Sequence, residues 1–231
     1  RGLAGALVAW SDFDDVLAYS TYNSLVVDGC TVERLTIESK RSAGGLFGNI
    51  RMRSSKELIF RNISVADSLI RVRTSLAHWR IKDAYAGGLI GHIYNGSSSV
   101  HPIAMSGVTV RGSAVLLESQ SYAKKNYAAG GLIGRISGTS RFEFDGCTVD
   151  GCVVGAYSPV NGSSGFPSDN ADAVAGLTGS VYDRIANAVA YLLANPGSVS
   201  DGDAGGFIGT SEYAFTVRNS RVVSDAASTI I

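Results

Sequence analysis

Apolar and polar positions alternate along this chain in short phrases that return at regular intervals. A glycine-rich phrase of six residues occurs five times: AGALVA from Ala4, AGGLFG from Ala43, AGGLIG from Ala86 and Ala129, and AGGFIG from Ala204. A second phrase follows each copy: CTVERLTI from Cys30, ISVADSLI from Ile63, VTVRGSAV from Val108, CTVDGCVV from Cys147 and SRVVSDAA from Ser220. Self-similarity of this kind is typical of repeat architectures.

The second phrase predicts a corner in each repeat. Its apolar positions stand at the first, third and eighth residues, as in Cys30, Val32 and Ile37. The first two fit one face of a strand, but the third has the wrong parity and belongs to another strand. The corners are predicted at Glu33-Arg34, Ala66-Asp67, Arg111-Gly112 and Asp150-Gly151.

Each repeat is therefore expected to supply about three short strands joined by bends. Such a unit cannot bury its apolar face alone, so repeats stack on one another. The fold class predicted for residues 1–231 is all-β, a single parallel β-helix or β-solenoid domain of about five coils.

Alternation within the glycine phrase places Leu89, Gly91 and Ile93 inside the solenoid and Ile90 outside. Glycine at the middle position is expected to leave room for a bulky residue of the opposite wall. An apolar residue follows the leucine position in every copy: Val8, Phe47, Ile90, Ile133 and Ile208. These five predict an outward apolar stripe, which another part of the chain or another molecule should cover.

The spacing of apolar residues changes from two to about 3.6 between residues 168 and 195, which predicts an inserted amphipathic helix. Its apolar face comprises Val174, Leu177, Val181, Ile185, Val189 and Leu192. Pro167 precedes a Ser168-Asp169 cap, and Asn195-Pro196-Gly197 ends the segment. Because Gly176 and Gly179 disfavour a helix, AGLTG from Ala175 can also be read as a degenerate sixth copy. The helix is a candidate cover for the apolar stripe.

Composition supports a soluble all-β chain without electrostatic partners. The sequence has 28 Gly, four Pro and 45% hydrophobic residues, as expected for many tight turns around apolar strands. Lys plus Arg equal Asp plus Glu at 20 each, so no global field attracts nucleic acid or an anionic membrane. No apolar run reaches the ~20 residues of a membrane-spanning helix, and no membrane insertion is expected.

Candidate chemistry is sparse. The glycine phrase matches neither GxGxxG nor GxxxxGK[ST], and strands rather than helices follow it, which argues against a phosphate loop. His78, His92 and His101 are interpreted as surface or turn histidines, because no HExxH motif or ligand spacing accompanies them. No serine sits in GxSxG.

Two acidic groups could supply oxygen ligands to calcium: Asp12, Asp14 and Asp15, and Asp201 with Asp203. Neither completes a calcium-loop motif. A glycosidase pair of carboxylates cannot be recognised without coordinates. The sequence therefore predicts no catalytic, cofactor-binding or metal-ligating residue and no cofactor.

Three cysteines occur, with Cys30 and Cys147 at equivalent interior positions of different coils. They are expected to be buried free thiols, with a Cys147–Cys152 disulfide across a corner as the alternative. Asn62, Asn95 and Asn161 head N-x-[ST] sequons, which matter only in a secreted glycoprotein.

The phrase GGL-[IVF]-G, followed by an apolar-x-Val strand, resembles the GLUG repeat of large surface and secreted proteins of bacteria and some protists. The match rests on Gly44–Gly48, Gly87–Gly91, Gly130–Gly134 and, less fully, Gly205–Gly209, while Ala4–Ala9 has alanine at two glycine positions. It covers most of the chain except the block near 156–203. The resemblance implies an extracellular or cell-surface, adhesin-like or structural solenoid. A metalloprotease signature found in some family members is missing, so protease activity is not implied.

The chain starts on a glycine phrase and ends just after a second phrase, with Ala227–Ile231 strand-like and no polar cap evident. Uncapped solenoid ends template strand addition. The leading hypothesis is a non-enzymatic structural or adhesive module that stacks head to tail or continues into further repeats, with a host or matrix glycan or protein as a possible partner. The alternative is a polysaccharide-active or glycan-binding solenoid, since ten tyrosines permit sugar stacking.

Overall fold

A computed structural model describes most of the repeats. The described residues are 2–12, 24–52, 57–74, 83–96, 103–119, 126–138, 141–157, 202–212, 214–223 and 229–230. The helix predicted at 168–195, and the alternative AGLTG copy within it, lie outside these residues.

The chain forms five coils of five short strands each. The first coil comprises β1 (Leu3–Gly5), β2 (Val8–Asp12), β3 (Ser24–Asp28), β4 (Thr31–Glu33) and β5 (Thr36–Ser39). The second comprises β6 (Ser42–Gly44), β7 (Phe47–Met52), β8 (Glu57–Arg61), β9 (Ser64–Ala66) and β10 (Leu69–Thr74). The third comprises β11 (Asp83–Gly87), β12 (Ile90–Asn95), β13 (Ile103–Ser106), β14 (Thr109–Arg111) and β15 (Ala114–Ser119).

The fourth coil comprises β16 (Asn126–Gly130), β17 (Ile133–Gly138), β18 (Phe142–Asp145), β19 (Thr148–Asp150) and β20 (Val153–Tyr157). The fifth comprises β21 (Gly202–Gly205), β22 (Ile208–Ser211), β23 (Phe215–Arg218), β24 (Arg221–Val223) and β25 (Thr229–Ile230). The all-β solenoid prediction is confirmed. The expectation of about three strands per repeat is wrong, because the glycine phrase spans two strands and a further strand precedes the second phrase.

Equivalent strands of successive coils pair in parallel, which gives five sheets of five strands. We number the sheets by their first-coil strand, so that the first sheet is β1-β6-β11-β16-β21 and the fifth contains β5 and β25. The register follows both phrases: Ala4, Ala43, Ala86, Ala129 and Ala204 align in the first sheet. Val32, Val65, Val110, Val149 and Val222 align in the fourth.

The predicted corner between the fourth and fifth sheets is confirmed by its backbone. Arg34, Asp67, Gly112 and Gly151 all have positive φ, between 49° and 58°. Left-handed φ turns the chain sharply and is costly for most L-residues, so glycine and short polar residues are favoured there. A second corner of this kind, between the third and fourth sheets, contains Gly29, Asn62, Gly107, Gly146 and Asn219.

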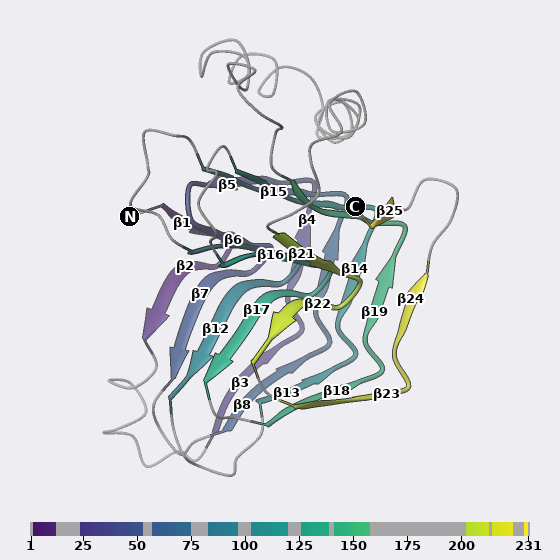
Figure 1. The fold of residues 1–231 in the computed structure, drawn as a ribbon. Helices are drawn as coiled ribbons and strands as arrows, with labels where there is room; N and C mark the ends of the chain where they lie inside the picture. Colours follow the sequence, from purple (N-terminus) through teal and green to yellow (C-terminus); the bar gives the residue numbers. More distant parts are fainter. Residues whose placement is uncertain are drawn as a thin grey trace, which may run out of the picture.

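Figure 1 shows the second, third and fourth sheets as three walls, with the fifth sheet above and the first sheet directly beneath it. The first sheet is buried on both faces in the middle coils. Ala86 and Ala129 belong to the hydrophobic core, while Ser42 on the opposite face donates a hydrogen bond of 2.5 Å to the Gly48 carbonyl of the second sheet. A strand covered closely on two sides requires small residues, which explains the alanines and glycines of the phrase.

The outward apolar stripe is a wrong prediction. Phe47, Ile90 and Ile133 are buried in the hydrophobic core, and the Phe47 ring meets Phe60 of β8 edge-on at 5.8 Å. Val8 and Ile208, in the end coils, are partly buried against the same core. Alternation is interrupted inside the second-sheet strands. Ile90 and Ile93 both belong to the core although they stand three residues apart in β12, and the ladder pairing skips Gly91 between them. The stripe therefore needs no cover.

The explanation of the middle glycine also needs correction. A Cβ at Gly88, not Gly91, would face the opposite wall, 2.9 Å from Val110 Cγ1 in the fourth sheet. A Cβ at Gly91 would instead lie 2.6 Å from the Ala43 carbonyl oxygen of the preceding coil. The Gly88 column thus permits close approach of the opposite wall, and the Gly91 column permits close approach of the neighbouring coil.

Candidate functional site

One polar cluster lies on the second sheet, where Asn49, His92 and Arg135 occupy the same ladder position of β7, β12 and β17. His92 contacts Asn49 and Ser137 on its two sides: Nδ1 lies 3.1 Å from Asn49 Nδ2 and Nε2 lies 2.7 Å from Ser137 Oγ. Because the Asn49 amide N–H is a donor, Nδ1 accepts and Nε2 carries the proton. The imidazole is therefore neutral and donates to Ser137.

Neighbouring groups from other strands complete this cluster. The Tyr85 ring of β11 lies 4.7 Å from the His92 ring, and the Arg135 guanidinium lies 5.4 Å from the Tyr85 centroid. Arg135 also pairs with Glu212, which accepts a 3.3 Å hydrogen bond from the Gly138 N–H. The third repeat therefore supplies both rings, Tyr85 and His92, and the fourth repeat supplies the Arg135 cation beside the Tyr85 ring.

Burial controls the protonation of this cluster. Burial, assisted by the charge of Arg135, lowers the pKa of His92 to about 4. Burial also raises the pKa of the Tyr85 phenol. Burial alone would raise the pKa of Glu212, yet hydrogen bonds from Arg135 and Gly138 leave it below its usual value. At neutral pH the cluster consists of neutral His92 and Tyr85 with an Arg135–Glu212 ion pair.

Ser137, His92 and Asn49 have the residue types of a nucleophile, base and orienting group. The tautomer is wrong for that chemistry, because an Nε2–H group cannot take a proton from Ser137. A pKa near 4 also makes His92 a poor general base at neutral pH. The geometry fits a structural hydrogen-bond ladder that links the second, third and fourth coils.

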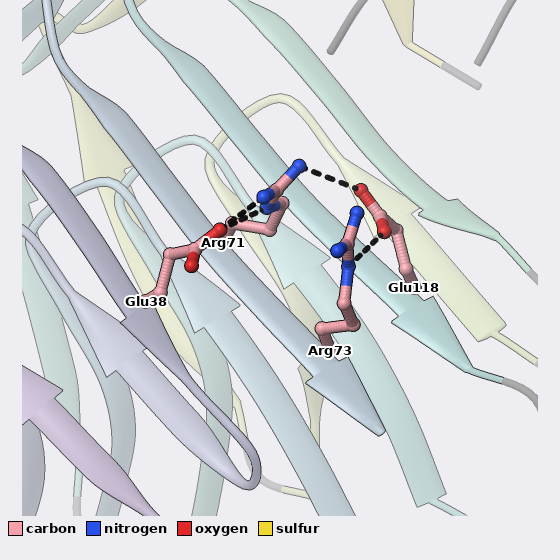
Figure 2. Close-up of polar contacts among 4 residues, drawn as sticks. All are labelled: Glu38, Arg71, Arg73 and Glu118. Atoms are coloured by element: carbon pink, nitrogen blue, oxygen red, sulfur yellow. Dashed lines mark hydrogen bonds and ion pairs between the residues drawn. The ribbon is translucent and has the colours of Figure 1, made fainter. Parts of the chain in front are cut away.

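A second cluster lies on the fifth sheet, on strands β5, β10 and β15 (Figure 2). Arg71 pairs with Glu38 and lies 3.8 Å from Glu118, and Arg73 Nε donates to Glu118 at 2.9 Å. The side chains of Arg71 and Glu118 are only 8% and 1% exposed. These residues alternate along the strands with core residues such as Ile70, Val72 and Leu117, so the cluster occupies the face directed away from the core. Two carboxylates pair with two guanidinium groups, and we interpret the cluster as an ionic clamp that is buried at Arg71 and Glu118.

The third candidate is the pair of end coils. Leu7, at the leucine position of the glycine phrase, is 56% exposed, whereas its equivalents Leu46, Leu89 and Leu132 are at most 2% exposed. In the fifth coil Phe215, Val217 and Val222 are each at least 40% exposed, although they align with core residues of the fourth coil. The last coil thus exposes three apolar core positions beside its edge strands. The first coil exposes Leu7, while its Val32 and Ile37 are buried.

Polar groups border these end coils at the corner between the third and fourth sheets. Asp28 of the first coil accepts hydrogen bonds from Arg61 Nε at 2.8 Å and Asn62 Nδ2 at 2.9 Å. The Asn62 and Arg61 bonds hold the pKa of Asp28 below its ordinary value. In the fifth coil Asn219 donates to Asp145 at 2.8 Å, and Arg218 is the ladder partner of Asp145.

The structure tests only some of the sequence-based predictions about histidines and acidic residues. His92 is a partly buried strand residue, not the surface or turn histidine expected. The structure does not describe the side chains of the other candidate residues: His78, His101, Asp12, Asp14, Asp15, Asp201 and Asp203. Among the described residues, no group of three or more His, Cys, Asp or Glu is arranged to hold a metal ion.

The thiol prediction is confirmed for Cys147 and Cys152. Both are free and buried, so the alternative Cys147–Cys152 disulfide is wrong, and Cys30 is free but only partly buried. Burial raises the pKa of Cys147, and that of Cys152 to about 11. Of the sequon asparagines, Asn62 is exposed and Asn95 is 2% exposed, while Asn161 lies outside the described residues.

Comparisons with family models, curated proteins and solved structures each gave no match. The resemblance to GLUG repeats stays a prediction that rests on the glycine phrase. Within the described part of the chain, no helix is both long and apolar enough to span a membrane.

Sequence reasoning missed both polar clusters, although a signal was present. Each glycine phrase carries, six positions after its first alanine, the column Trp10, Asn49, His92, Arg135 and Thr210. Directly after the second phrase, two repeats carry a charged residue in a further column, Glu38 and Arg71. Polar residues in register across repeats would have indicated lateral contacts between coils, because stacked columns lie about 4.8 Å apart.

Proposed function

We propose that this protein is a non-enzymatic structural module, extracellular and adhesive or fibre-forming, that works by lengthening its β-solenoid through its end coils. The observation that supports the proposal is where apolar surface remains exposed. Of the seven large apolar side chains exposed in the described structure, six lie in the first or last coil: Leu7, Val26, Leu35, Phe215, Val217 and Val222. Only Tyr94 among them lies on a middle coil.

Exposed apolar side chains on the edge strands of the end coils favour self-association. An edge strand offers unpaired backbone groups to another chain, and polar capping or charge normally prevents that pairing. Here core valines and a phenylalanine stand beside the edge strands, so docking would bury apolar area and complete hydrogen-bond ladders together. Neither polar cluster offers a comparable driving force, because their charged groups are already paired within the chain.

Sedimentation velocity and negative-stain electron microscopy over rising protein concentration test the proposal. We expect rods of constant width whose length grows with concentration. Val222→Lys, which places an ammonium group in the exposed valine column, should raise the concentration for half-assembly at least about 10-fold, or 1.4 kcal/mol.

Tyr94→Lys is the matched control, since it also replaces an exposed apolar side chain by lysine but lies on the side of the third coil. It should leave assembly unchanged. Monomers at every concentration, or equal effects of the two substitutions, would rule out assembly through the end coils.

A further inference from the structure

The end coils carry complementary charges at one ladder position. The column at the end of the third-sheet strands reads Asp28, Arg61, Ser106, Asp145 and Arg218 from the first coil to the fifth. Its charges alternate as negative, positive, neutral, negative and positive. The first coil therefore ends this column with a carboxylate and the last coil ends it with a guanidinium group.

We propose that a second copy of this chain docks its first coil on the last coil in the internal register, with Arg218 opposite Asp28 of the partner copy. This inference rests on the end-coil assembly proposed above and adds its direction and register. It gives a head-to-tail contact, which does not close on itself and builds filaments.

The same pair of residue types already meets across one coil spacing inside the molecule, with the aspartate in the earlier coil and the arginine in the later one. Asp28 binds Arg61 across one coil spacing with an Nε–Oδ2 distance of 2.8 Å. Docking places Arg218 at the same ladder position on the open side of Asp28. Asp28 then lies between two arginines, and Arg218 lies between Asp145 and Asp28 of the partner copy. The next position is also compatible, because Asn219 would face Gly29, whose Cβ position has no atom within 4 Å.

The apolar columns continue across the same junction. Val222 would stack on Val32 of the second copy and extend the valine column of the fourth sheet. Val217 and Phe215 would stack on Val27 and Leu25, which occupy the same third-sheet columns in the first coil. A docking shifted by one residue would instead place these inward columns against outward ones.

A charge-swap experiment tests the register. The variants Asp28→Lys and Arg218→Glu each place like charges opposite one another in a head-to-tail stack, so each alone should assemble at a concentration at least about 10-fold above wild type. Mixed in equal amounts, they restore opposite charges at every junction between unlike copies. The mixture should assemble within about threefold of the wild-type concentration.

Glu143→Lys is the control, because it reverses an exposed charge on the side of the fourth coil and leaves both ends intact. Circular dichroism on every variant verifies that the solenoid is folded. If wild type assembles and the single variants assemble equally well, the register is wrong while end-coil assembly stands. Dimers that grow no further indicate symmetric docking of like ends and overturn the head-to-tail direction. Absence of wild-type assembly overturns both proposals.

Discussion

At the scale of single residues, glycine columns decide how closely the walls of this solenoid approach. Gly88 and Gly131 face valines of the fourth sheet, with Val110 Cγ1 and Val149 Cγ1 each 2.9 Å from the position a Cβ would take. The carbonyl oxygen of the next coil's glycine lies closer still at both positions. A methyl group there collides with backbone, which a rotamer change cannot relieve.

Gly88→Ala should therefore lower the free energy of unfolding by about 3 kcal/mol or more, measured by urea denaturation. Gly29→Asn is the control, since its Cβ meets open space and its φ of 67° suits asparagine. Asn62 and Asn219 already occupy that column in other coils. The control should change stability by less than about 0.5 kcal/mol; a harmless Gly88→Ala would contradict the close packing of the walls.

His92 should make stability depend on pH between about 5 and 7. Its pKa is about 4 in the folded protein and about 6.5 when unfolded, so only the unfolded state binds a proton in this window. Stability consequently falls as pH falls, by about 2 kcal/mol between pH 7 and pH 5. Asp28 and Glu212, whose pKa values are lowered, contribute only below this window.

Urea denaturation at pH 7 and pH 5 measures this effect, and His92→Gln supplies the comparison. The variant lacks the titrating group and should lose most of the difference between the two pH values. An equally steep pH dependence in His92→Gln would assign the effect to other groups.

At the scale of strands, the ionic clamp on β5, β10 and β15 links three coils through charge rather than apolar packing. Glu118→Gln removes a 1% exposed carboxylate that pairs with Arg73 and lies 3.8 Å from Arg71. Breaking a buried ion pair on one side typically costs about 3 kcal/mol. Glu38→Gln alters the other end of the same cluster, where the side chain is 42% exposed, and should cost less than about 1 kcal/mol.

Thermal and urea denaturation of both variants at low and high salt provide the measurement. The Glu118→Gln loss should persist in 1 M salt, because buried pairs are screened weakly. Equal losses in the two variants would show that Glu118 behaves as a surface charge.

The register between strands was predictable from the sequence, whereas the burial of individual side chains on each strand was not. Repeats aligned without gaps fixed the columns of Ala86 and Val110, since identical short phrases stack most simply on one another. The burial of Ile90 depended on an interruption of alternation at Gly91, where the ladder pairing of β12 skips a residue, and the alternation rule does not predict such an interruption. The clusters around His92 and Arg71 were hidden for another reason, because their partners lie 33 to 45 residues away in sequence.

At the scale of the whole molecule, the solenoid should be most stable in its middle and least stable at its ends. In stacked repeats each unit gains stability from two neighbours, and an end unit has only one. The burial pattern follows this rule: β13 alternates buried and accessible residues, while most of β23 is exposed. Local opening should begin in the first and fifth coils.

Hydrogen exchange measured by mass spectrometry can locate this difference and relate it to assembly. β13 and β23 belong to the same sheet, so their peptides form a matched pair. In dilute wild type the β23 amides should exchange at least about 10-fold faster than those of β13. At assembling concentrations β23 should become protected, because docking occurs only on the folded end coil and stabilises it.

The Val222→Lys variant should retain fast exchange in β23 at every concentration, which separates assembly from crowding. Equal protection of β13 and β23 in dilute protein would mean that the last coil is already stabilised on its open side, and the exposed Phe215, Val217 and Val222 would then lose their role as an assembly surface. Slow exchange in the middle with concentration-dependent protection at both ends is the result that only an extendable solenoid gives.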